Sequence, residues 1–225
     1  MACTIGVVVF PGSNCEQDVV EAVTGLGAEG RLLWHGDHDV GAVDAIVIPG
    51  GFAHGDYLRP GAIARFSPMM GAIGEFAADG GPVVGICNGF QVLTEAGLLP
   101  GALQKNAGLK FVCAPAELEV HAADTVLTSR ATPGQRLHIP INHFEGNYTC
   151  SNEVLAELRA NQRIVLTYVD NPNGSVADIA GICNEARNVV GLMPHPERAI
   201  NPLLGSDDGN ILFGSLLDTA GIAVS

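Results

Sequence analysis

The sequence predicts an α/β protein in which a parallel sheet has helices on both faces and carries a smaller antiparallel extension. In the first half, short β-branched runs alternate with segments of helical periodicity, a pattern typical of parallel strands joined by helices. The second half is richer in strand-like runs, which favours antiparallel pairing. Hydrophobic residues make up 47% of the 225 residues and charged residues only 16%, so the chain can bury a large core. No linker, repeat or low-complexity tract interrupts it, and we expect one domain over residues 1–225.

The elements of the first half follow from apolar spacing and from glycine and proline. The apolar run Thr4–Phe10 predicts a buried strand that ends at Pro11-Gly12, and helical spacing of apolar residues then predicts a helix over Cys15–Leu26. Pro68 interrupts a later helical segment and is expected to begin a new helix, where its missing N–H costs nothing. The other strands expected here are Arg31–Trp34, Asp44–Ile48 and Pro82–Ile86, and the other helices are Ala62–Ala78 and Gly89–Ala96.

The second half is expected to contain mostly strands. A helix fits Glu153–Ala160, capped by Ser151, and a closing helix fits Asn210–Thr219. Asn173-Gly174 is a hairpin signal. The strands expected here are Lys110–Cys113, Glu117–His121, Thr125–Ser129, Arg136–Ile141, Arg163–Val169, Ser175–Cys183 and Asn188–Met193.

The charge and the cysteines limit the classes of function. The net charge is −13, with 11 Lys and Arg against 24 Asp and Glu, and no cationic cluster exists to bind phosphate. We therefore expect neither a nucleic-acid nor a membrane partner. The six cysteines form no C-x-x-C pair, which argues against both a zinc site and a disulfide framework, so no metal is expected. The N-terminus lacks the positive region of a signal peptide, and we expect a cytoplasmic protein.

The strongest chemical signal is a strand that runs into Gly85-Ile86-Cys87-Asn88-Gly89 and then into a helix. This is the nucleophile-elbow pattern with cysteine in place of serine, and the tight turn requires small residues on either side of the nucleophile. A cysteine at a helix N-terminus is favoured as thiolate by the helix dipole. A structural cysteine on a tight turn is the alternative, so the neighbouring groups decide between the two.

A partner for the cysteine occurs in Pro194-His195-Pro196-Glu197. The prolines keep the chain extended, and residues two apart in an extended chain face the same way. Glu197 can therefore hold the His195 imidazole, as a general base for a thiol requires. Two further residues fit this site. Gly51 ends another strand, where it can supply a second oxyanion donor, and Gln91 lies one helical turn after Cys87.

Several motifs together resemble the class I, or triad, glutamine amidotransferases. They are GICNGFQ at 85–91, PHPER at 194–198 and PGGFAHGDYLRPGAIARF at 49–66. More narrowly, the chain resembles the family of glutaminase subunits of phosphoribosylformylglycinamidine synthase, in purine biosynthesis. The segments that carry this resemblance are FPGSNCEQD at 10–18, GLLPGAL at 97–103 and GSVADIAGI at 174–182.

The resemblance implies a flavodoxin-like three-layer sandwich with a mostly parallel central sheet. It implies that Cys87 is the nucleophile, His195 the base and Glu197 its orienting partner. Gly51 and Asn88 would form the oxyanion hole, while Gln91 and His143 would help to hold glutamine. The chain departs from the family at Phe144, where the related segment more often reads His-Gly-Glu-Gly.

The resemblance also implies L-glutamine as substrate and two partners, a large synthetase subunit and a small third subunit. The glutaminase would pass ammonia to the synthetase, which converts formylglycinamide ribonucleotide to formylglycinamidine ribonucleotide with ATP. No cofactor is expected on this chain, because ATP and Mg belong to the synthetase. Two alternatives remain, another cysteine hydrolase of similar fold and a non-catalytic scaffold subunit.

Overall fold

One nine-stranded sheet runs through the protein in the computed structural model, which describes residues 3–221. The strand order is β2-β1-β3-β4-β11-β10-β9-β6-β7, and a separate two-stranded sheet pairs β5 with β8. The strands are β1 Thr4–Val9, β2 Glu29–Trp34, β3 Ala45–Ile48, β4 Val83–Ile86, β5 Ala102–Gln104, β6 Val112–Val120, β7 Arg136–His143, β8 Asn147–Thr149, β9 Ile164–Tyr168, β10 Ile179–Cys183 and β11 Val189–Leu192.

Five α-helices and several short 3-10 turns connect these strands in the described part of the chain. The α-helices are α1 Glu16–Gly25, α2 Pro68–Ala78, α3 Asn88–Glu95, α4 Asn152–Ala160 and α5 Gly209–Thr219. The 3-10 turns are Ala53–Asp56, Ala64–Phe66, Val176–Asp178, Pro196–Arg198 and Pro202–Leu204. No helix between residues 3 and 221 combines the length and apolar character needed to cross a membrane.

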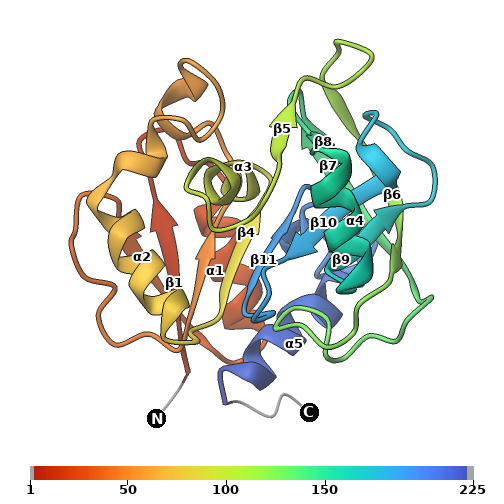
Figure 1. The fold of residues 1–225 in the computed structure, drawn as a ribbon. Helices are drawn as coiled ribbons and strands as arrows, with labels where there is room; N and C mark the ends of the chain where they lie inside the picture. Colours follow the sequence, from red (N-terminus) through yellow and green to blue (C-terminus); the bar gives the residue numbers. More distant parts are fainter. Residues whose placement is uncertain (1–2, 222–225) are drawn as a thin grey trace.

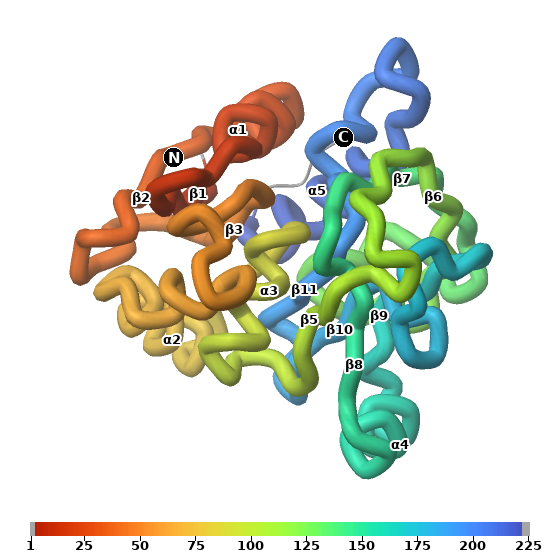
Figure 2. Tube along the Cα trace, turned by 90° about the horizontal axis from the view of Figure 1, so that it is seen from above, coloured from red at the N-terminus to blue at the C-terminus, as the bar shows by residue number. Residues whose placement is uncertain are grey.

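The sheet changes from parallel to antiparallel at β11. Strands β2, β1, β3, β4 and β11 pair in parallel, whereas β10, β9, β6 and β7 continue the same sheet with antiparallel pairing. Helices α1 and α5 cover one face of the sheet, and α2, α3 and α4 lie on the other (Figures 1 and 2). The predicted α/β sandwich with an antiparallel extension is therefore confirmed.

The parallel strands direct their carboxyl ends to one edge of the sheet, where ligands bind in open α/β folds. Gly51 follows β3, Cys87 follows β4 and His195 follows β11, so three distant segments meet there. Two loops project above this edge, over residues 52–62 and 105–111 (Figure 1).

One predicted strand is wrong. Residues Thr125–Ser129 form a turn in which the Thr128 hydroxyl donates to the Ala122 carbonyl oxygen at 2.7 Å and bonds the Thr125 hydroxyl at 2.7 Å. Threonine matches a strand pattern by its branching, but here its hydroxyl groups satisfy the chain locally and replace a ladder.

Other boundaries also differ from the prediction. The two strands expected over 110–121 form one strand, β6, and the short strands β5 and β8 were not predicted. The Asn173-Gly174 signal does not make a two-residue hairpin, because β9 and β10 are joined through residues 169–178. The helix start at Pro68 and the Ser151 cap, whose hydroxyl accepts from the Val154 N–H at 3.3 Å, are confirmed.

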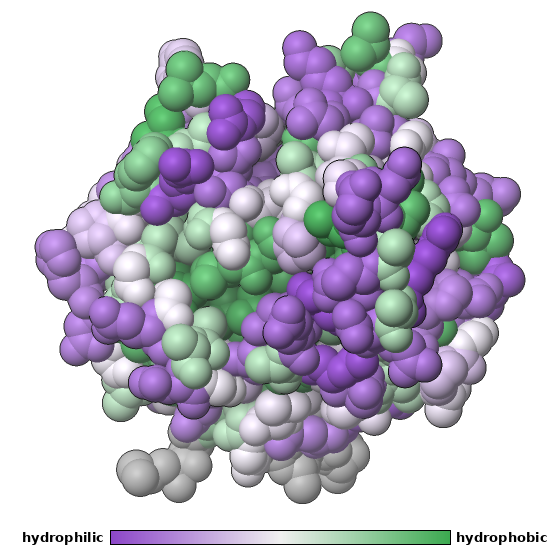
Figure 3. Space-filling view, in the orientation of Figure 1, coloured by the Kyte–Doolittle hydropathy of each residue, from purple (hydrophilic) through white to green (hydrophobic). Residues whose placement is uncertain are grey.

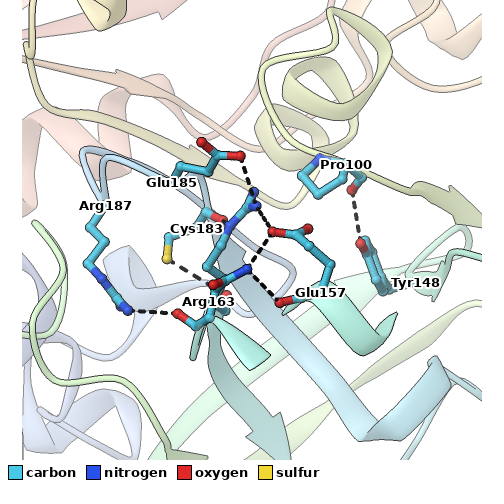
Figure 4. A network of polar contacts seen from close by, with 8 residues as sticks. Pro100, Tyr148, Glu157, Arg163, Cys183, Glu185 and Arg187 are labelled. Atoms are coloured by element: carbon cyan, nitrogen blue, oxygen red, sulfur yellow. Dashed lines mark hydrogen bonds and ion pairs between the residues drawn. The ribbon is translucent and has the colours of Figure 1, made fainter. Parts of the chain in front are cut away.

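A polar network fastens α4 to the antiparallel half of the sheet (Figure 4). The buried Arg163 guanidinium donates to Glu157 at 2.7 Å and to the Cys183 carbonyl oxygen at 3.0 Å. Because a buried charge requires a partner, Glu157 and the strand carbonyl together make this arginine tolerable in the interior. The Tyr148 hydroxyl donates to the Pro100 carbonyl oxygen at 2.9 Å and anchors β8 nearby.

Candidate active site

A narrow cavity of about 40 Å³ lies at the carboxyl edge of the parallel strands. We call it the Cys87 cavity; five of the seven predicted site residues line it, namely Gly51, Cys87, Gln91, His143 and His195. The rest of its wall is Asn14, Cys15, Phe52, Asp56, Asn142, Phe144, Glu145 and Arg198. A larger groove of about 740 Å³ beside α4 contains none of the predicted site residues.

The turn that carries Cys87 is strained. Cys87 has φ 50° and ψ −104°, a conformation that L-residues rarely adopt, and strain of this kind clusters at functional sites. The flanking glycines leave the room that the turn needs. A Cβ at Gly89 would lie 2.0 Å from the Ile48 carbonyl oxygen, and one at Gly85 would lie 2.7 Å from the Gly89 backbone. Steric exclusion thus requires glycine on both sides of the nucleophile elbow.

His195 and Glu197 form a buried pair. The ring nitrogen Nδ1 lies 2.6 Å from Glu197 Oε1, and the two side chains are almost fully excluded from solvent. Burial opposes the imidazolium, but the charge of Glu197 and the sulfurs of Cys87 and Cys15 outweigh it and raise the pKa of His195 well above its usual value. The site therefore favours a protonated imidazole beside the thiol, the form that activates a cysteine nucleophile.

Gly51 and Asn88 bring two backbone segments next to Cys87. Gly51 has φ 142°, and a Cβ there would lie 2.7 Å from the Asn14 nitrogen, so only glycine fits. Asn88 is the first residue of α3, where its N–H has no partner within the helix. The Asn88 side chain accepts from the Ala53 N–H at 3.0 Å and so fastens the Gly51 segment to the elbow.

Gln91 and His143 are buried rather than solvated. The Gln91 amide accepts from Asn88 Nδ2 at 2.9 Å and donates to the Glu145 carbonyl oxygen at 2.5 Å, which ties α3 to the loop after β7. Phe144, the departure from the family pattern, lines the cavity, and its ring lies 5.8 Å from Lys105 Nζ.

Four charged or nucleophilic groups of the wall were not predicted. Arg198 Nη2 donates to Cys15 Sγ at 3.3 Å. Burial, together with the neighbouring Glu145, raises the pKa of Asp56 to about 6, and burial also raises the pKa of Glu145. Asp56 comes from a loop in which the non-glycine residues His54, Asp56 and Leu58 all have positive φ. Such backbone geometry produces no hydrophobic periodicity in the sequence. The signal that could have identified this loop is its place, residues 50–58, within the family motif at 49–66.

One group of side chains could be considered as a metal site. Among residues 3–221, the candidate ligand atoms of Cys15, His195 and Glu197 lie within 4.8 Å of one another. The Arg198 guanidinium already contacts the Cys15 sulfur, and its positive charge opposes a second cation there. The arrangement fits proton transfer better than metal binding.

The fold and this site define a class of protein. Residues 2–207 match the model of the CobB/CobQ-like glutamine amidotransferase domain, and the chain belongs to that family.

Particular relatives are closer. The phosphoribosylformylglycinamidine synthase subunit PurQ of Rubrobacter xylanophilus is 57% identical over 213 residues, which are 95% of this chain and 97% of that protein. The subunit of the same name from Salinibacter ruber is 51% identical over the full length of both chains.

Solved structures agree with these relatives. A chain of PurLQS from Thermotoga maritima superposes with a TM-score of 0.90 at 42% identity, covering 97% of this chain and 99% of that one. Another glutamine amidotransferase from Thermotoga maritima has a TM-score of 0.64 at 15% identity, covers 99% of this chain and all of that one, and supports the fold alone.

Proposed function

We propose that this chain is the glutaminase subunit of a phosphoribosylformylglycinamidine synthase. It hydrolyses L-glutamine to glutamate and ammonia, and a separate synthetase subunit uses the ammonia with ATP to convert formylglycinamide ribonucleotide to formylglycinamidine ribonucleotide. The observation that carries the proposal is the meeting of the Cys87 elbow with the His195–Glu197 pair in one cavity. Family membership and the similarity to PurQ proteins over nearly the whole chain support it.

In the mechanism, the Cys87 thiolate attacks the side-chain carbonyl carbon of glutamine. The N–H groups of Gly51 and Asn88 stabilise the oxyanion, a contribution typically worth about 3 kcal/mol for each donor. His195, held by Glu197, gives its proton to the amide nitrogen; the C–N bond breaks, ammonia leaves and a γ-glutamyl thioester remains. His195 then takes a proton from water, which attacks the thioester, releases the thiolate and yields glutamate.

The partners in this proposal are a large synthetase subunit and a small third subunit, as in the PurLQS assembly. ATP and Mg are assigned to the synthetase, and no cofactor to this chain. The two loops that project above the sheet edge carry exposed apolar side chains, namely Tyr57, Leu58, Leu109 and Phe111. Green hydrophobic side chains lie at the tips of both projections, among hydrophilic ones (Figure 3). Exposed apolar side chains that gather on one face are typical of interaction surfaces, so we place the synthetase contact there.

Two further parts of the proposal concern the chain as a whole. We assign residues 1–225 to one glutamine amidotransferase domain, of which residues 1–2 and 222–225 lie outside the described part. The reaction is assigned to the cytoplasm, where the six free thiols would stay reduced.

Labelling with a glutamine-mimicking diazoketone tests the proposal, followed by intact mass and peptide mapping, with and without the synthetase subunits. A single adduct on Cys87 is expected, and Cys87→Ser should abolish it. Cys15→Ser removes the second buried thiol of the cavity and should leave the adduct on Cys87 unchanged. An adduct on the exposed Cys113 would indicate non-specific alkylation. An adduct that moves to Cys15, or no adduct in either preparation, would contradict the assignment.

A further inference from the structure

His143 presents an unusual ring to the Cys87 cavity. Only 3% of the residue is exposed, and among the described residues its Nε2 atom has no hydrogen-bond partner although it is buried. Its Nδ1 atom lies 3.1 Å from Asn106 Oδ1. Buried polar atoms are nearly always paired, so an unpaired Nε2 on the wall of a cavity points to a ligand.

The hydrogen bonds of Asn106 fix which ring nitrogen carries the proton. The Asn106 amide nitrogen donates to the carbonyl oxygens of Lys110 at 2.9 Å and His143 at 3.0 Å. Asn106 Oδ1 is therefore the acceptor, and it also accepts from the Gly146 N–H at 3.0 Å. His143 must donate from Nδ1 to this oxygen, which leaves a lone pair on Nε2.

The ring is also neutral. Burial, together with the charge of the nearby His195, lowers the pKa of His143 to about 4. Gly146 makes room for the ring, because a Cβ there would lie 2.2 Å from its Cε1 atom. The structure thus holds a neutral, oriented hydrogen-bond acceptor in the wall of the cavity that Cys87 also lines.

The scissile amide of glutamine needs such an acceptor. The proposed oxyanion donors at Gly51 and Asn88 serve the carbonyl oxygen, and the protonated His195 is a donor as well. The amide N–H groups therefore remain to be paired. Asn142, which precedes His143 in β7, places its carbonyl oxygen 3.8 Å from Cys87 Sγ, so this part of the strand adjoins the attacking atom.

We propose that His143 Nε2 accepts a hydrogen bond from the side-chain amide N–H of bound glutamine, and that Asn106 is the positioning residue that fixes the required tautomer. The inference rests on the proposed glutaminase function and deepens it. As the nitrogen becomes tetrahedral, the bond turns its lone pair toward His195 for protonation. His143 then selects an amide over an ester as substrate.

The test compares the kcat/KM of glutamine with that of glutamate γ-methyl ester, which lacks the amide N–H. The assembled complex is used, with wild type, His143→Phe and His143→Gln. His143→Phe is expected to lower the glutamine value about tenfold more than the ester value, the effect of one lost hydrogen bond. The glutamine side chain offers an amide oxygen near the position of Nε2, so His143→Gln should recover part of the preference. His38→Phe, on an exposed loop residue, is the matched control and should leave the ratio unchanged.

Two further arms make the inference refutable. Asn106→Leu should lower the amide-to-ester ratio in the same direction as His143→Phe, because the tautomer is no longer fixed. Glutaramate keeps the amide but lacks the α-ammonium group, and His143→Phe should lower its kcat/KM as much as that of glutamine. Loss on glutamine and ester alike, with glutaramate unaffected, would show that His143 binds the ammonium and would overturn the inference. Equal loss on all three substrates would reduce His143 to a structural role. If the wild-type complex releases no ammonia from glutamine, the proposed function itself fails.

Discussion

Glu197→Gln tests how much the negative charge of Glu197 contributes to the function of His195. The carboxylate contacts His195 Nδ1 at 2.6 Å through Oε1, while Oε2 is buried and has no partner among the described residues. A glutamine side chain can therefore place its amide oxygen toward Nδ1 and keep the tautomer. The negative charge is lost, and the amide nitrogen takes the place of Oε2.

The magnitude follows from this geometry. A hydrogen bond to a charged group contributes about 1.5–3 kcal/mol and a neutral one about 0.5–1.5 kcal/mol, so the substitution costs about 1.5 kcal/mol. That corresponds to roughly a tenfold lower kcat/KM for glutamine hydrolysis. Glu197→Ala removes the hydrogen bond as well and should cost roughly 100-fold or more.

The pH dependence gives a second readout. Since Glu197 helps to raise the pKa of His195, its charge keeps the imidazolium populated to higher pH. In Glu197→Gln the alkaline limb of kcat/KM should move to lower pH, because less imidazolium remains to protonate the leaving nitrogen. Glutamate release measured across the pH range gives this profile. Glu185→Gln, at a highly exposed carboxylate, is the control. A Glu197→Gln variant with an unchanged alkaline limb and kcat/KM within twofold of wild type would refute the reasoning.

Three other changes test separate parts of the structure. Gly89→Ala should lower the free energy of unfolding by about 3 kcal/mol, because its Cβ would lie 2.0 Å from the Ile48 carbonyl oxygen. Gly71→Ala in α2 is the control and should raise the free energy of unfolding slightly, because its Cβ would contact nothing. Denaturant titration measures both values. Burial raises the pKa of Asp56 from 3.8 to about 6, so the folded protein favours the protonated carboxyl. The ionised carboxylate therefore destabilises the fold, and this cost develops as the pH rises from 3.8 to about 6. Asp56→Asn should therefore stabilise the protein at pH 8, by about 1–2 kcal/mol after allowance for solvent screening, and not at pH 4; equal thermal shifts at the two pH values would contradict this. Leu58 is 90% exposed, so Leu58→Asp should weaken binding to the synthetase about tenfold in a calorimetric titration and leave thermal unfolding unchanged. Unchanged affinity together with a lowered unfolding temperature would contradict this prediction.

The sequence predicts those parts of the site that depend on residues close together in the chain. The elbow around Cys87 follows from glycines two residues to either side of it, and the Glu197 contact follows from a two-residue separation in extended chain. The strands of the parallel half are predictable for the same reason, since each is a continuous apolar run between turn residues.

Contacts made by distant segments are not encoded in any short pattern. Asn106 meets His143 only because the loop after β5 folds over the end of β7, and Arg198 meets Cys15 across the length of the chain. The Asp56 loop depends on left-handed residues that composition does not reveal. Short strands such as β8 have too few residues to show alternation, and they exist because β5 lies alongside.

The bond from the Gln91 amide to the Glu145 carbonyl has a consequence for the resting subunit. A cavity of about 40 Å³ holds only a few water molecules, since each needs roughly 10–15 Å³ of this kind of volume. Because this bond ties α3 to the loop after β7 across the cavity, a wider cavity requires the bond to break. The Gln91–Glu145 bond therefore links the size of the Cys87 cavity to the position of the loop after β7 relative to α3.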